Sequence, residues 1–98
     1  MDFLVVAHDD PAPGTAEKRS RLRPGHLDNM KALMRSGNVI DGGALVDQGK
    51  AIGSTFFCTF ENRESLDRAL AKDPFLQNGV WQRVEVFEMI RPESLRAG

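Results

Sequence analysis

The chain alternates strand-like and helical segments in an order that few folds can accommodate. A run of apolar and β-branched residues at positions 3–7 is typical of a buried strand. Apolar side chains recur at helical spacing over residues 27–34 and again over residues 66–70. The other strand-like segments are residues 39–46, 51–60 and 80–89. A short polar turn separates the first two of these, which predicts a hairpin.

The resulting order, strand, helix, hairpin, helix, strand, is the βαββαβ pattern of the ferredoxin-like fold. We therefore predict an α+β protein in which a four-stranded antiparallel sheet carries two helices on one face. A length of 98 residues suits a single domain, residues 1–98. Within it, we expect Arg91 to Gly98 to form a loosely held tail.

Residues with strong positional preferences indicate where the helices begin and end. Thr15 is expected to cap the first helix, and Gly37 is suited to its C-terminal end. Pro24 lies inside this helical stretch, where it either kinks one helix or marks the first turn of another. Pro74 is expected to end the second helix, which contains residues 66–70.

The third strand is apolar on both of its faces. Phe56, Cys58 and Phe60 alternate with Thr55, Phe57 and Thr59. Helices that cover only one face of the sheet leave the other face in need of cover, and a bare apolar face is a surface for a partner or ligand. A chain this short also has little depth for a closed cavity. We therefore predict a homodimer or a higher homo-oligomer.

Charge and cysteine content exclude several classes of protein. Thirteen basic residues against fourteen acidic ones give a formal charge of −1, which argues against a generic nucleic-acid or anionic-membrane binder. No apolar run is long enough to span a membrane, and the N-terminus lacks the pattern of a signal peptide. The single cysteine excludes an internal disulfide and a multi-cysteine zinc site, and it favours a cytoplasmic location.

Two residues stand out as candidates for acid–base chemistry. His26 lies at the edge of the apolar stripe of the first helix, where a ring nitrogen can face a pocket. Asp73 precedes Pro74, where a helix-ending acid is unfavourable to the helix dipole. If the two side chains met, the carboxylate would orient the imidazole as in general-base dyads. The alternatives are a histidine bonded to a backbone carbonyl and an ordinary acid at a helix end.

Other polar positions favour structural explanations or remain ambiguous. His8, next to Asp9 and Asp10, lacks the spacing of a metal site, so we expect a solvated strand end and no bound metal. The basic cluster that ends at Arg23 is either a solvated helix face or a site for a small anion. Cys58 is expected to be a buried apolar side chain.

Glycines flank the predicted hairpin at two places. Gly42-Gly43 is expected to break the second strand, and Gly53-Ser54 begins the apolar part of the third. Such positions either let a ligand approach the backbone closely or form bulges. No motif for a nucleotide, dinucleotide or metalloprotease site is present, so no cofactor is expected.

Taken in order, several motifs resemble those of the YCII-related (YciI-like) family. The matching segments are Arg23-Pro24-Gly25-His26-Leu27, Gly42-Gly43, Gly53-Ser54, and Asp73-Pro74-Phe75 followed by Gly79-Val80. The resemblance implies the fold of the dimeric α+β barrels, a His26–Asp73 dyad, and a pocket to which Gly43 and Ser54 contribute. The family often has Gly-Pro after the second strand, whereas this chain has Gly43-Ala44.

The leading hypothesis is an enzyme without a cofactor that eliminates from or isomerises a small organic, anionic or aromatic substrate. His26 would be the general acid or base, Asp73 would orient it, Arg23 would hold an anion and Ser54 would hydrogen-bond the substrate. The alternative is a non-catalytic ligand-binding or accessory module in which the histidine–aspartate pair is structural. A third hypothesis is a dimerisation domain, which predicts no small molecule between sheet and helices.

Overall fold

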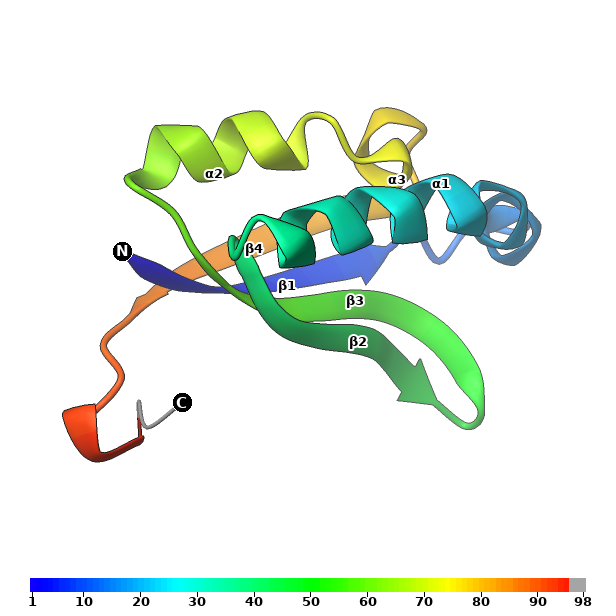
Figure 1. Ribbon diagram of the computed structural model, residues 1–98. Coiled ribbons are helices and arrows are strands. Elements are labelled where there is room, and N and C mark those ends of the chain that lie inside the picture. The colour runs from blue at the N-terminus through cyan, green and yellow to red at the C-terminus, as the bar shows by residue number, and fades with distance from the viewer. Residues whose placement is uncertain (96–98) are drawn as a thin grey trace.

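The computed structural model describes residues 1–95, which form one sheet with helices on one side (Figure 1). Between the first strand and the hairpin lies a single long helix, and two short helices precede the last strand. The elements are β1 (Asp2–Asp9), α1 (Thr15–Arg35), β2 (Val39–Asp47), β3 (Lys50–Thr59), α2 (Arg63–Leu70), α3 (Pro74–Gln77), β4 (Trp81–Met89) and the 3₁₀ turn η1 (Glu93–Leu95).

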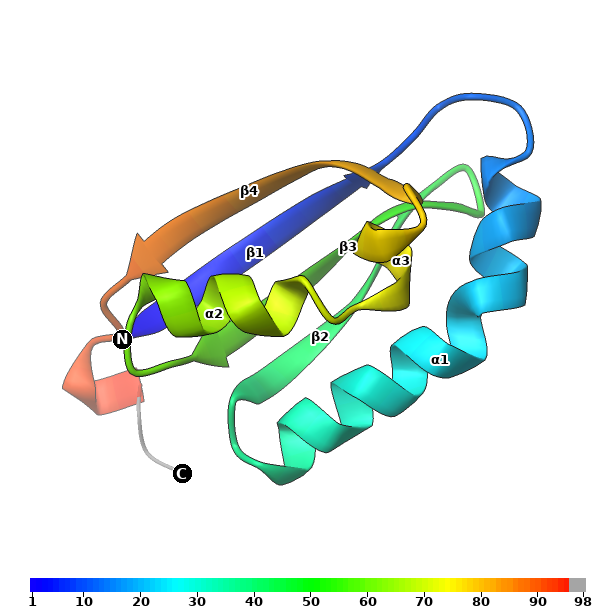
Figure 2. The same ribbon diagram turned by 90° about the horizontal axis from the view of Figure 1, so that it is seen from above.

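The sheet has the strand order β2-β3-β1-β4, and every neighbouring pair is antiparallel. This is the ferredoxin-like arrangement predicted from the sequence. All the helices lie above one face of the sheet, with α1 over the β2–β3 side and α2 nearer β1 and β4 (Figure 2). No helix among residues 1–95 is long and apolar enough to cross a membrane.

The helix α1 is continuous from Thr15 to Arg35 with Pro24 inside it, and its ribbon bends part-way along its length (Figure 2). Of the two expectations for Pro24, the kinked single helix is therefore the one observed. The prediction that Thr15 caps the helix is wrong. Gly14 is the N-cap residue, with a φ of 92° and no side-chain hydrogen bond to the helix, because the chain turns sharply at this glycine.

The end of α1 agrees with the expectation for Gly37. This residue has a φ of 86°, and its backbone N–H donates to the carbonyl of Met34 at 3.1 Å. The N–H of Asn38 donates to the carbonyl of Leu33 at 2.9 Å. Together these bonds form a Schellman motif, which satisfies the last helical carbonyls and turns the chain into β2.

The strand β2 is continuous, contrary to the expectation that Gly42-Gly43 breaks it. Both glycines pair with β3, and the register shifts occur on either side of them, between Val39 and Asp41 and between Leu45 and Val46. The reason is a close approach of the two strands. A Cβ atom on Gly42 would lie 2.6 Å from the Cβ atom of Phe56, so only glycine fits there.

The chain after α2 also differs from the expectation. The helix α2 ends at Leu70, before Pro74 is reached, and Pro74 instead begins the one-turn helix α3. Asp73 is the N-cap of α3, and its side chain accepts a hydrogen bond from the backbone N–H of Phe75. It is therefore at the favourable end of a helix dipole and not, as predicted, at the unfavourable end.

The core lies between the sheet and the helices, and Val5, Cys58 and Phe75 in it are fully buried. The opposite, open face of the sheet carries the alternate side chains of each strand. In that layer Leu4 pairs with Phe57 on one side and with Phe87 on the other. At the end of this face the Arg91 guanidinium lies 4.8 Å from the centre of the Phe57 ring. Of the predicted tail, residues 96–98 lie outside the described part of the chain.

Candidate active site

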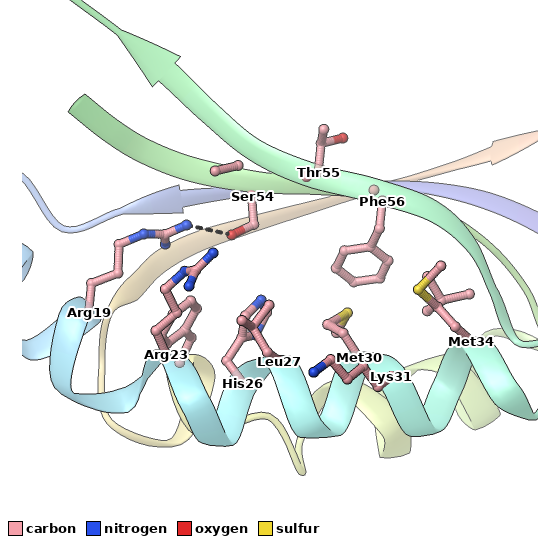
Figure 3. Close-up of a pocket in the computed structure, with 15 residues that line it drawn as sticks. Arg19, Arg23, His26, Leu27, Met30, Lys31, Met34, Ser54, Thr55 and Phe56 are labelled. Carbon is pink, nitrogen blue, oxygen red and sulfur yellow. Dashed lines mark hydrogen bonds between the residues drawn. The ribbon is translucent and has the colours of Figure 1, made fainter. Parts of the chain in front are cut away.

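A cavity of about 310 Å³ lies between α1 and the strands β2 and β3 (Figure 3). We call it the inner cavity. One side of it is apolar, with Leu27, Met30 and Phe56, and the other carries arginine, histidine and serine side chains. The wall consists of Arg19, Arg23, His26, Leu27, Met30, Lys31, Met34, Val39, Gly42, Gly43, Ala44, Ser54, Thr55, Phe56 and Phe75.

The structure brings together His26 and Asp73, which are 47 positions apart in the chain. Nδ1 of the imidazole lies 3.0 Å from Oδ1 and 2.9 Å from Oδ2 of the carboxylate. His26 is 8% exposed and Asp73 is completely buried. The kink of α1 and the start of α3 place the two side chains, and the carboxylate lies behind the ring as seen from the inner cavity.

Two further donors define the state of the carboxylate. The backbone N–H of Phe75 donates to Oδ1 at 2.9 Å, and the side-chain amide of Asn29 donates to Oδ2 at 3.0 Å. Both oxygens therefore act as acceptors, so Nδ1 of His26 carries the hydrogen of the shared bond. In the neutral imidazole the lone pair is then on Nε2, the nitrogen that does not face Asp73.

Nε2 of His26 is open to the inner cavity. This nitrogen has no hydrogen-bond partner within residues 1–95. Because every buried side-chain nitrogen and oxygen in this range does have a partner, Nε2 is not buried and is accessible from the cavity. The ring is held in place by stacking on Phe75, with centroids 4.1 Å apart and an interplanar angle of 12°. The edge of Trp81 approaches it at 5.6 Å. The imidazole is thus oriented by a carboxylate and two aromatic rings.

Ser54 and Arg19 form a second polar group beside the histidine. The hydroxyl of Ser54 accepts from Nη2 of Arg19 and from Nε1 of Trp81, both at 3.3 Å. Arg19 also donates to both carboxylate oxygens of Asp9 at 3.2 Å and to the carbonyl of Gly53. Since two donors occupy the lone pairs of the Ser54 oxygen, its own hydrogen is left for a ligand in the cavity.

Asp9 differs from these groups because burial disfavours the charged form of its carboxyl. Burial raises the pKa of its carboxyl above the ordinary value, and the positive charge and hydrogen bonds of Arg19 counteract only part of this effect. The side chain of Asp9 is 7% exposed, and that of Arg19 is 12% exposed. The pair fixes the Arg19 guanidinium, which lies 4.7 Å from the centre of the Phe75 ring.

Of the residues predicted from the sequence, His26, Arg23, Gly43 and Ser54 all line the inner cavity. Asp73 supports the histidine from behind. His8 lies elsewhere, on the open face of the sheet, where its Nε2 is 2.6 Å from a carboxylate oxygen of Glu85. Within residues 1–95, no cluster of three or more histidine, cysteine or acidic side chains is arranged to hold a metal ion.

Sequence reasoning missed Asn29 and Trp81, placed Asp9 at a solvated strand end, and left the basic cluster that contains Arg19 open between a solvated face and an anion site. The position of Asn29, one helical turn after His26, was a usable indication that both side chains face the same partner. Nothing local marks Trp81, which meets Ser54 only through the pairing of β4 and β3 with β1. The Asp9–Arg19 pair likewise joins the end of a strand to the first turns of the next helix.

Comparison with known proteins agrees with the motifs. The model of the YCII-related domain matches residues 1–90. The chain belongs to the YCII-related family. It is 31% identical over 93 residues to an uncharacterized protein of Haemophilus influenzae. It is 30% identical to the protein YciI of Escherichia coli, and in each comparison the match covers 88% of this chain and 93% of the relative.

Solved structures show the same fold. A 5-chloro-2-hydroxyhydroquinone dehydrochlorinase from Burkholderia phenoliruptrix, in complex with 2,5-dihydroxybenzoquinone, is similar with a TM-score of 0.81 at 21% identity. The match covers 96% of this chain and 98% of that one. A muconolactone isomerase has a TM-score of 0.70 at 18% identity, over 96% of this chain and 93% of its own. These likenesses show the fold, a four-stranded antiparallel sheet with helices on one face.

Proposed function

We propose that this protein is an enzyme that moves a proton on a small organic substrate, with His26 as general acid or base and Asp73 as its positioning residue. One observation carries the proposal. The imidazole is fixed by a buried carboxylate at Nδ1, and its free Nε2 faces a cavity of about 310 Å³. A base must lie within hydrogen-bond reach of the proton it removes, and this nitrogen is the group positioned to do so.

The chemistry that follows is elimination or isomerisation. Nε2 removes a proton from the substrate, and the imidazolium that forms is stabilised by the carboxylate of Asp73 at Nδ1. In an elimination, the electron pair released forms a double bond and expels a leaving group on the neighbouring atom. In an isomerisation, His26 returns the proton to a different atom. In both routes the atoms and electrons balance without a cofactor.

The rest of the inner cavity favours a flat ligand with an oxygen atom. The hydroxyl of Ser54 is available as a donor, and Arg23 supplies a positive charge without a partner among the described residues. The apolar side chains of Leu27, Met30 and Phe56 suit the body of a ring. We therefore propose a cyclic or aromatic substrate that bears an oxygen able to accept a hydrogen bond.

The activities of two proteins with this fold support the same class of reaction. One removes chloride from a chlorinated hydroxyhydroquinone, and the other is a muconolactone isomerase. Dehydrochlorination is an elimination and the other reaction is an isomerisation, which are the two reactions proposed here. At 21% and 18% identity the likeness establishes the fold, and the choice of substrate for this chain is our proposal.

The test is an activity screen followed by substitution of the histidine. Chlorinated hydroxyhydroquinones and muconolactone are the first substrates to try, with chloride release and ultraviolet absorbance as readouts. His26→Gln is expected to lower kcat by about 10²–10⁴-fold. His8→Gln, which changes the only other histidine, should leave kcat unchanged. Equal activity of folded His26→Gln and wild-type protein would refute the role of the dyad.

A second candidate function is a non-catalytic module that binds the same kind of ligand. The buried contacts of Asp73 with Phe75 and Asn29 favour it, since they also give the carboxylate a structural task. A His26→Asn variant separates the two. If it lowers thermal stability while ligand affinity stays unchanged, and no turnover is found in the screen, the module is the better description.

We also propose that the protein works as a homodimer in the cytoplasm. On the open face of the sheet Phe87 is 48% exposed, and Phe57 lies in the same row on the other side of Leu4. A second copy of the same face would cover this row. The unpaired thiol of Cys58 supports the cytoplasmic location.

A further inference from the structure

A second, larger cavity of about 650 Å³ lies beside the inner cavity, between the start of α1 and the tip of the β2–β3 hairpin. We call it the outer cavity. Figure 1 shows the hairpin tip and the first turns of α1 at the same end of the molecule. The outer cavity is lined by Asp9, Asp10, Pro11, Ala12, Thr15, Ala16, Arg19, Ser20, Arg23, Ala44, Lys50, Ala51 and Ile52.

The two cavities share three wall residues, Arg19, Arg23 and Ala44. Arg19 is held by Asp9, Gly53 and Ser54 and is therefore a fixed part of the partition. Arg23 lies one turn further along α1, is exposed, and makes no hydrogen bond or ion pair within residues 1–95. A ligand that passes Arg23 can therefore occupy both spaces at once.

The charges of the outer cavity do not cancel. The carboxylate of Asp9 is paired with Arg19 at 3.2 Å, and one oxygen of Asp10 accepts from the backbone N–H of Ala12 at 2.9 Å. Lys50, on the opposite wall, has no ion-pair or hydrogen-bond partner in the described part of the chain. Asp10 keeps its negative charge, so the three cations Arg19, Arg23 and Lys50 exceed the two carboxylates of this wall by one positive charge.

The remaining wall between these charges is largely apolar. It consists of Pro11, Ala12, Ala51 and Ile52, and Ile52 is 49% exposed. An apolar wall that ends in two unpaired cations matches a ligand segment with a short hydrocarbon stem and an anionic end. The first residues of α1, Thr15 and Ala16, line the same space, and the positive end of the helix dipole adds to the field.

We propose that the outer cavity is a second subsite, which binds an anionic group at the end of an apolar stem on a ligand whose ring lies in the inner cavity beside His26. This extends the proposed function, because it predicts an acidic substituent on the substrate. Lys50 and Arg23 are the residues that recognise the anion. Lys50 is a specificity-determining residue that does not reach the reacting atoms.

The experiment measures binding and does not depend on turnover. The probes are 4-hydroxyphenyl alkanoic acids of increasing tail length, each compared with its uncharged primary amide by calorimetry at low ionic strength. The wild-type protein should bind the acids more tightly than the amides, with a best tail length, and added salt should weaken only the acids.

The variant Lys50→Gln should weaken binding of the best acid about two- to fivefold and leave its amide unchanged. Lys50→Glu should weaken the acid further, since it reverses the charge. Lys72→Gln is the matched control, because Lys72 is an exposed lysine outside the outer cavity, and it should change neither ligand. All three changes are at exposed side chains, so the fold should tolerate them.

Three results would overturn this subsite: acids that bind no better than amides, equal effects of Lys50→Gln and Lys72→Gln, or no binding of any acid at millimolar concentration. Its failure is distinguishable from failure of the proposed function. In His26→Gln the preference for acid over amide should persist, whether or not an enzymatic activity is found.

Discussion

At the scale of single residues, Asp73 combines two tasks that usually fall to different side chains. Its carboxylate caps α3 through the N–H of Phe75 and holds Nδ1 of His26. A base positioned by a helix cap cannot move unless the helix moves with it. The candidate site is therefore built into the fold itself, because the same buried oxygens satisfy the backbone and orient the imidazole.

A second residue-scale consequence concerns Cys58, whose thiol is fully buried in the core. Burial, with a smaller contribution from the negative charge of Asp2, raises the pKa of the thiol to about 11. We expect the folded protein not to react with a thiol-specific reagent such as dithionitrobenzoate at mildly alkaline pH, and the urea-unfolded protein to react at once. Rapid labelling of folded protein would contradict the burial of this residue.

The Asp9 carboxyl predicts a specific pH dependence of stability. Because its pKa is raised in the folded state, the folded protein holds this proton more tightly than the unfolded chain does. The contribution to stability is thus fully present below the ordinary pKa of about 3.9 and is lost as the pH rises through the higher folded value.

The variant Asp9→Asn isolates this effect. Urea unfolding of both proteins, at a series of acidic pH values, gives the difference in unfolding free energy, wild type minus variant. We expect this difference to fall as the pH rises above the ordinary carboxyl pKa, since the residue at position 9 titrates in the wild type and not in the variant. A difference that stays constant or rises with pH would contradict the raised pKa.

At the scale of elements, the strand β2 contains two neighbouring glycines with opposite constraints. A Cβ atom on Gly42 would lie 2.6 Å from Cβ of Phe56 and 2.7 Å from the carbonyl oxygen of Thr55. A Cβ atom on Gly43 would meet no heavy atom within 4 Å. The first glycine therefore permits the close pairing of β2 with β3, and the second leaves room in the inner cavity.

Alanine at each position tests this difference. Gly42→Ala should lower the unfolding free energy by about 1–3 kcal/mol, because the strands must separate to admit the methyl group. Gly43→Ala should leave stability unchanged or raise it by up to about 1 kcal/mol, because alanine loses less backbone entropy in a strand. Chemical denaturation gives the unfolding free energy of both variants. Equal decreases in the two would contradict the close approach of β2 and β3 at Gly42.

At the scale of the whole molecule, the open face of the sheet is the surface that the single chain leaves uncovered. It carries Leu4, Phe57 and Phe87 in one cross-strand row, while the helices cover only the opposite face (Figure 1). A contiguous apolar row in which Phe87 is exposed and Leu4 and Phe57 are half-buried favours burial against a second copy.

The variant Phe87→Asp should convert a dimer into a monomer, measured by analytical ultracentrifugation, since it places a charge within the apolar row. Met34→Asp is the matched control. Met34 is 49% exposed against 48% for Phe87, but it lies on α1, on the other side of the molecule. A wild-type protein that is monomeric, or equal effects of the two variants, would refute the proposed interface.

The order of the four strands and the two main helices could be predicted from the sequence. Hydrophobic periodicity records local burial, so the strands, the hairpin and the stripe around His26 follow from it. The resemblance of motifs pointed to His26 and Asp73 together, although the spacing of each in the chain left both open to a structural explanation.

Tertiary structure alone decided how these residues meet. The helix that begins at Pro74 turns Asp73 from a helix-ending acid into a cap and a partner of His26. The register of the sheet brings Trp81 to Ser54, 27 positions apart. The physical reason is that periodicity encodes which side of an element is buried, whereas contacts between distant residues depend on how the elements cross and pair, which no single segment specifies.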